Sequence, residues 1–281
     1  IAFYAVVSGW ILYYFVKFLT GQNQDFGFEK MITTPSVNVT YLLFTLLIAF
    51  VILSFHLQGG LERITKYMMS ALIVLMLVLA VHSFTLPGAG EGLGFYLIPH
   101  FSKITGSVVV GAMNQAFFTL SVGMGGMAIF GSYIGKDRSL MGESIHIIIL
   151  DTLVAVIAGI IIFPACFTYD VEVTAGPSLL FDTMATVFNN MAGGRWWGTL
   201  FFLFMVFAAM STVLGVCENI LAMVRELTGW SRPVGCIVCG VGTFLLALTT
   251  ALGFSVIHFQ PFAAGTTWLD FWVFLVSHHI M

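Results

Sequence analysis

Long apolar runs separated by shorter polar segments recur along the whole chain. Each run holds about 20 residues, which is enough to cross the hydrocarbon core of a bilayer as a helix. Helices are expected because backbone polar groups inside a bilayer must be paired internally, and the period-two alternation of barrel strands is absent. The pattern therefore predicts helices over 1–20, 40–57, 66–86, 108–133, 145–168, 197–224, 234–257 and 268–281, the last of them incomplete.

One further segment, 177–190 (PSLLFDTMATVFNN), has apolar residues at helical spacing but is too short and too polar to cross. We expect an extracellular helix there, folded onto the mouth of the bundle. The orientation follows from the connectors, because Lys and Arg concentrate in cytoplasmic loops. The short connectors 58–66, 134–144 and 225–233 hold most of the Lys and Arg residues outside the spans, which places these connectors in the cytoplasm.

The composition agrees with a chain that lies mostly in lipid. Hydrophobic residues make up 59% and charged residues 8%, with a mean hydropathy of +1.02. A soluble domain carries about 25% charged residues, so a soluble enzyme and a secreted disulfide scaffold are excluded. The net charge of -3 and the scattered Lys and Arg residues exclude a nucleic-acid partner. We expect a multi-pass membrane protein, and an internal part of a longer chain, because Ile1 and Met281 both lie inside apolar runs.

The run 108–133 differs from the other spans in its polar and glycine content. Polar residues between Asn114 and Ser121 lead into glycines at positions 123, 125 and 126. Glycine in a helix interior costs about 1 kcal/mol relative to alanine, so this density predicts a break in the helix near 121–126. Close helix packing through small residues is the alternative.

A second unusual span carries a stripe of small and hydroxyl-bearing residues. Ala208, Ser211, Thr212 and Gly215 fall at i, i+3, i+4 and i+7, so they share one face of a helix. Alone, such a stripe is typical of helix packing. Opposite a broken helix, its hydroxyls and the unwound carbonyls would form an oxygen cage for a cation, as in secondary transporters.

Asp151 lies inside the strongly apolar run IILDTLVAVIAGIIIF. An ionised carboxylate at that depth is costly, and such residues usually mark a path for ions or protons. The alternative is a protonated acid that hydrogen-bonds to a neighbouring helix. An intramembrane enzyme would need a partner acid or nucleophile, and Thr152, Val154, Ala155 and Ala158, at helical spacing from Asp151, supply none.

Several segments, in this order, resemble the neurotransmitter:sodium symporter family, and in particular its bacterial amino-acid transporters. The most specific is NQAFFTLSVGMGG (114–126), which resembles the broken sixth helix of that family. GLERITK (60–66), GFYLIPHFSK (94–103), GPSLLF (176–181) and the stripe at 208–216 also fit. The resemblance covers nearly the whole chain. It implies an all-α, inverted-repeat fold in which this fragment covers about helices 3 to 10, with helices 1 and 2 and the C-terminal helices absent.

The resemblance also implies a substrate pocket, two sodium sites and a gate. The pocket residues would be Tyr4, Phe118, Thr119, Ser121, Met124, Thr212 and Val216. The sodium ligands would be Thr119 and Asp151 at the first site, and the Ala208 carbonyl with the Ser211 and Thr212 hydroxyls at the second. Phe118 would close over the substrate, and Asp270 would lie at an outer gate. Na⁺ would be the driving ion, with no organic cofactor.

Four positions bear on how this chain would compare with other members. Asp151 stands where the family usually has asparagine, and Ala155 stands where chloride-dependent relatives have serine. A fixed carboxylate would replace bound chloride as the compensating charge, so we expect chloride-independent transport. Gln115 matches a residue near the chloride position and leaves that question open, and Ser70 replaces the usual proline of helix five.

The implied function is sodium-coupled symport of amino acids across the cell membrane by alternating access. Met124 and Val216 predict an apolar pocket for hydrophobic neutral L-amino acids. A membrane sensor with the same pocket but no transport is the alternative, and an occluding pocket argues against a channel. The missing first helix would supply ligands to both sodium sites, so this fragment alone is not expected to transport. Homodimerisation remains open.

Overall fold

The computed structural model describes residues 1–24, 27–55, 62–122, 131–132, 139–173, 176–262 and 265–275. Every regular element in those ranges is a helix. Five helices are long and apolar enough to cross a membrane. They are α3 (Pro35–Ser54), α4 (Glu62–Phe84), α8 (Leu140–Thr168), α10 (Gly194–Thr228) and α11 (Arg232–Leu252). A shorter apolar helix, α1 (Tyr4–Thr20), opens the chain.

Shorter helices fill the connectors and the two outer spans. They are α2 (Phe28–Ile32), α5 (Ala89–Leu97), η2 (Phe101–Lys103), α6 (Gly106–Thr119), the π-helical turn η3 (Leu179–Thr183), α9 (Met184–Asn190) and α12 (Trp268–Leu275). The segment expected as one extracellular helix, 177–190, is thus a π-helical turn that continues into a short α-helix. The hydropathy pattern gave no sign of α2, which is short and lies in a polar connector, or of α5, whose sequence is rich in glycine. Each is nevertheless held by a buried apolar residue, Met31 in α2 and Ala89 in α5.

Some helix ends differ from the sequence expectation for local reasons. The helix expected over 40–57 begins five residues earlier, at Pro35, because proline is well suited to the first helical turn and Asn38 is buried rather than exposed. The helix expected over 234–257 ends at Leu252, where the next residues form turns. The span expected over 108–133 begins as α6, which ends at Thr119, and positions 123–130 and 133–138 lie outside the described residues.

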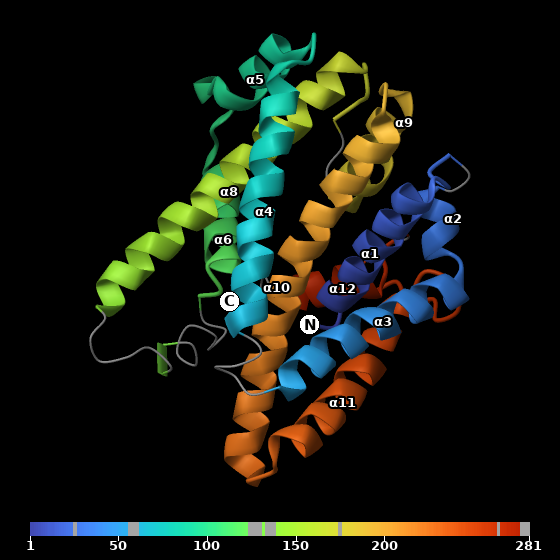
Figure 1. The fold of residues 1–281 in the computed structure, drawn as a ribbon, viewed down its shortest axis with the longest axis vertical. Coiled ribbons are helices and arrows are strands. Elements are labelled where there is room, and N and C mark those ends of the chain that lie inside the picture. The colour runs from blue at the N-terminus through green and yellow to red at the C-terminus, as the bar shows by residue number, and fades with distance from the viewer. Residues whose placement is uncertain are drawn as a thin grey trace.

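The core is built around α1, which packs against α3 on one side and α10 on the other. Trp10, Tyr14 and Phe18 on α1 are fully buried at the centre of an aromatic cluster. Gly9 permits the close approach to α3, because a Cβ there would lie 3.1 Å from the backbone nitrogen of Leu42. Figure 1 shows α10 running along the bundle past α1 and α4, with α5 and α9 near one end and the α10–α11 turn at the other.

Candidate ion and substrate site

The first pair of predicted ligands meets where α6 ends against α8. The Thr119 hydroxyl lies 3.2 Å from both carboxylate oxygens of Asp151. Thr119 is the last residue of α6, and Asp151 lies in the first half of α8. The two oxygen-bearing groups, 32 residues apart in sequence, therefore face one another.

The backbone after Thr119 leaves the helical path. Leu120 caps α6, and Ser121 adopts a left-handed conformation with φ of 54°. A non-glycine residue in this region is uncommon and costs energy, and such residues cluster at functional sites. Ser121 is the first residue of the region, 121–126, where a break in the helix is predicted. Met124 and the glycines that follow lie outside the described residues.

The second set of predicted ligands shares one carbonyl oxygen on α10. Ser211 donates its hydroxyl hydrogen to the Ala208 carbonyl at 2.7 Å, and the Thr212 hydroxyl lies 3.4 Å from the same oxygen. All three oxygens therefore lie on one face of α10, within a single helical turn. Neither Ser211 nor Ala208 is fully buried, and Thr212 is exposed.

The remaining pocket candidates lie on three different helices. Tyr4 opens α1 and packs against a buried cluster that α3, α10 and α11 share and that includes Met210 and Val213 of α10. Phe118 is half-buried one residue before Thr119. Val216 is half-buried on α10, one turn beyond Thr212. The tyrosine therefore lies near the stretch of α10 that carries the hydroxyl stripe.

Asp270, the predicted gate residue, makes a local contact in this structure. Its carboxylate accepts hydrogen bonds from the Thr267 backbone amide at 2.7 Å and from the Thr267 hydroxyl at 3.0 Å. An acidic residue three positions after the N-cap satisfies amides that have no partner in the first turn of a helix. Asp270 thus stabilises the start of α12, and its part in a gate stays a prediction.

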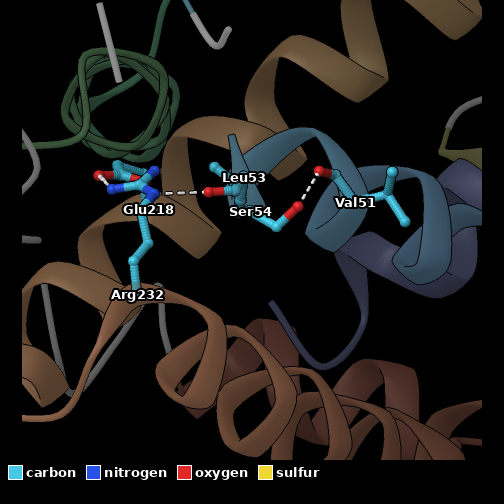
Figure 2. Close-up of polar contacts among 5 residues, drawn as sticks. All are labelled: Val51, Leu53, Ser54, Glu218 and Arg232. Carbon is cyan, nitrogen blue, oxygen red and sulfur yellow. Dashed lines mark hydrogen bonds and ion pairs between the residues drawn. The ribbon is translucent and has the colours of Figure 1, made fainter. Parts of the chain in front are cut away.

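A buried ion pair near the other end of α10 was not predicted. Arg232 lies across Glu218, with nitrogen–oxygen distances of 2.7 and 3.1 Å, and also donates to the Leu53 carbonyl at 2.6 Å (Figure 2). The Glu218 side chain is 1% exposed and that of Arg232 is 13% exposed. The pair and the Leu53 carbonyl join the end of α3 and the start of α11 to α10. Hydropathy assigned Arg232 to a connector, and sequence spacing could not show that its side chain reaches back to Glu218.

The donor atoms decide what kind of ion could bind. Carboxylate, hydroxyl and carbonyl oxygens suit hard cations, whereas soft or borderline metals prefer sulfur and imidazole. Within the described residues, no group of three or more His, Cys, Asp or Glu side chains could hold a metal ion. The residues at 119, 151, 208, 211 and 212 thus fit an alkali cation better than a transition metal.

A carboxylate–hydroxyl pair where α6 ends, together with a hydroxyl stripe on α10, offers the oxygen ligands typical of ion-coupled secondary transporters. Comparison with known proteins gives the family. The model of the sodium:neurotransmitter symporter family matches residues 24–280. The chain belongs to that family.

Relatives of known sequence and structure agree with this assignment. An uncharacterised sodium-dependent transporter of Bacillus subtilis, YhdH, is 32% identical over all of this chain and 64% of its own length. A similar protein of Haemophilus influenzae is 30% identical over 94% of this chain and 63% of its own length. The crystal structure of MhsT in complex with L-phenylalanine superposes with a TM-score of 0.88 at 34% identity, covering 98% of this chain and 64% of that one. The chain thus spans somewhat less than two thirds of these relatives.

These findings confirm the expected fold class, an all-α multi-pass membrane protein with the inverted-repeat symporter fold. They also confirm the expectation of a membrane transport family rather than an enzyme family, since the relatives are described as transporters.

Proposed function

We propose that the full-length protein is a sodium-coupled symporter of hydrophobic neutral L-amino acids in the cell membrane. The observation that carries this proposal is the contact between Thr119 and Asp151 at the end of α6. A carboxylate facing a hydroxyl where a helix ends provides negative charge and oxygen ligands at one point. The names of the relatives, sodium-dependent transporters, support sodium as the cation.

In this proposal two sodium ions bind, one at each oxygen group. Thr119 and Asp151 hold the first ion. The Ala208 carbonyl and the Ser211 and Thr212 hydroxyls hold the second, after the hydroxyls turn away from the carbonyl to which they now point. Hard oxygen ligands favour alkali and alkaline-earth ions over softer metals.

The substrate would lie between α1, α6 and α10. Tyr4 would hold the amino-acid carboxylate, Phe118 would close over the side chain, and Ser121, Met124, Thr212 and Val216 would line the pocket. An apolar residue at position 216 favours a hydrophobic side chain, and a structural neighbour, MhsT, was crystallised with L-phenylalanine. Asp270 would take part in the outer gate.

Asp151 makes chloride unnecessary in this proposal. A cation beside an uncharged site needs a compensating anion, whereas a carboxylate within reach of the ion supplies the charge itself. No extra anion is needed at Ala155, which has no side-chain ligand to offer. Transport without chloride is therefore the expected behaviour.

The membrane potential supplies enough energy for concentrative uptake. Two sodium ions with a zwitterionic amino acid move two charges, worth about 4.6 kcal/mol at 100 mV, since one charge is worth about 2.3 kcal/mol. At about 1.4 kcal/mol per decade, the voltage alone supports roughly thousandfold accumulation. No nucleotide hydrolysis is needed.

The test is uptake by the full-length protein in liposomes under an inward sodium gradient. We expect labelled phenylalanine, leucine, methionine, tyrosine and tryptophan to compete with one another, and uptake to persist when gluconate replaces chloride. Glycine and glutamate serve as competitors that should fail. Uptake that stops without chloride would refute the role given to Asp151. Tight sodium-dependent binding without flux would favour the membrane sensor instead.

A further inference from the structure

The C-terminal half of α8 contains Pro164, which interrupts the hydrogen bonding of the helix. Proline has no N–H, so the helical hydrogen bond from residue 164 to the Ile160 carbonyl cannot form. A buried carbonyl without a donor costs free energy, and a helix without that bond bends more easily. Asp151 lies on the same helix, on the N-terminal side of Pro164.

A side chain from another helix supplies the missing donor. Ser83, near the end of α4, donates its hydroxyl to the Ile160 carbonyl at 2.9 Å and lies 3.3 Å from the Ile161 carbonyl. Ser83 is 2% exposed, so water cannot take its place easily. The Ile160 carbonyl thus receives its hydrogen bond from a side chain of α4 rather than from the backbone of α8.

The short helix α5 holds α8 beyond the proline. The Gly88 amide donates to the Thr168 hydroxyl at 3.0 Å, and Thr168 in turn donates to the Pro164 carbonyl at 2.7 Å. Gly92 lies so close to α8 that a Cβ there would be 2.6 Å from the Pro164 Cα. The start of α5 therefore rests directly on the outer end of α8.

The end of α5 holds α8 before the proline. The Tyr96 hydroxyl donates to the Ala155 carbonyl at 3.4 Å, and the Tyr96 ring stacks on Phe163 with centroids 4.7 Å apart. The ring also occupies the space that a Cβ on Gly159 would need. Ala155 is one helical turn from Asp151. The helix α5 with its N-cap therefore contacts α8 on both sides of Pro164.

We propose that Ser83 and α5 form a brace across Pro164 that holds Asp151 in register with Thr119. The inference rests on the proposed sodium site, because Asp151 matters through the ion that it holds. Ser83 and Tyr96 are positioning residues, which act on the ion through α8 without touching it. Alignment errors of about an ångström at a binding site are expensive, so a loose α8 weakens sodium binding.

The test is a double-mutant cycle between Ser83 and Pro164 in the full-length protein. Its readout is the sodium concentration that gives half-maximal binding of labelled L-phenylalanine. Ser83→Ala should raise this concentration roughly three- to tenfold, because one buried hydrogen bond is lost. Pro164→Ala restores the N–H, so adding Ser83→Ala to it should change the value within about twofold. Thr85→Ala, which removes an exposed hydroxyl that donates to the His82 carbonyl of its own helix end, is the matched control.

A second pair of variants tests the brace without touching Ser83. Gly159→Ala should displace the Tyr96 ring and raise the half-maximal sodium concentration in the same direction, while Gly142→Ala, in the first turn of α8, should not. The brace would be overturned if Ser83→Ala raised the half-maximal sodium concentration equally in the presence of Pro164 and of Pro164→Ala. It would also be overturned if neither Ser83→Ala nor Gly159→Ala changed that concentration. Wild-type binding that ignores sodium would instead overturn the proposed function, and the brace with it.

Discussion

Single residues carry the charge and hydrogen-bond chemistry of the site. Asp151 combines three properties that bear on sodium: a carboxylate, a position inside a membrane helix and a hydroxyl partner 3.2 Å away. In the proposed site, its charge would compensate that of the cation directly. The Ala208 carbonyl differs, because it would attract the ion only as a dipole and shares its oxygen with two hydroxyls.

Replacing Asp151 by asparagine removes the charge and keeps the shape. We expect Asp151→Asn to raise the sodium concentration for half-maximal uptake about tenfold, equivalent to about 1.4 kcal/mol of lost binding energy. We also expect its uptake to respond to chloride, whereas the wild type is expected to transport without it. Glu143→Gln removes a carboxylate from the first turn of the same helix and should change neither property. Wild-type sodium dependence in Asp151→Asn would contradict the assignment.

Asp182, in the turn η3, predicts a pH effect outside the proposed transport site. Partial burial raises its pKa above the usual 3.8, although a backbone hydrogen bond from Phe28 opposes the shift. The folded state therefore favours the protonated acid, and this contribution to stability is lost as the pH rises through the folded-state pKa. Asp182→Asn should raise the unfolding temperature slightly at pH 7 and not below pH 3.8, as thermal unfolding in detergent can show. A variant less stable than the wild type at pH 7 would contradict this.

At the level of helices, two kinds of contact fix how the elements cross. One is the ion pair of Glu218 and Arg232, which ties α3, α10 and α11 together. The other is close backbone approach at glycine, as at Gly9 between α1 and α3.

The ion pair predicts a non-additive loss of stability. Glu218→Gln leaves the Arg232 charge without its counterion in a mostly buried position, which costs about 3–5 kcal/mol. Glu218→Gln combined with Arg232→Gln should cost less than the sum of the single changes, because no unpaired charge remains. Glu226→Gln, at an exposed position on the same helix, should alter the unfolding free energy by less than about 0.5 kcal/mol. Additive losses in chemical unfolding would show that the pair is not a unit.

The close packing of α1 on α3 at Gly9 predicts that alanine lowers stability there, whereas alanine at the open position Gly242 raises it. Gly9→Ala places a methyl group 3.1 Å from backbone atoms of α3, so we expect a loss of about 1–3 kcal/mol in unfolding free energy. Gly242→Ala in α11 meets no atom within 4 Å and should gain about 0.5–1 kcal/mol, because alanine favours the helix. Equal effects of the two substitutions on unfolding in detergent would contradict the close crossing.

The helices differ in how far the sequence alone could predict them. Apolar length predicted the long spans, because the bilayer leaves little choice of backbone structure. Glycine density predicted the region where α6 ends, and Asp151 attracted attention because a charge in an apolar run is costly. The helices α2 and α5 were missed, since tertiary contacts at Met31 and Ala89 hold them rather than any periodic pattern. The partner of Glu218 was missed because hydropathy says nothing about which side chains meet across helices.

At the scale of the whole molecule, the chain carries two oxygen groups, Thr119 with Asp151 across α6 and α8, and the stripe on α10 alone. In the proposed symport, both groups would be filled together with the substrate before the protein changes its exposure. A ligand shifts such an equilibrium only by binding one state better than the other. In this proposal, the coupling of sodium to substrate therefore depends on how several helices pack together and on no single helix.

Accumulation against a gradient tests this account most directly. The full-length protein, reconstituted in liposomes with sodium outside and potassium inside, should concentrate labelled L-phenylalanine above its external level. Gramicidin, which collapses the sodium gradient and the potential, should release the accumulated amino acid. Choline in place of sodium should give no uptake. Sodium-dependent binding with no accumulation, or accumulation that survives gramicidin, would contradict sodium-coupled symport.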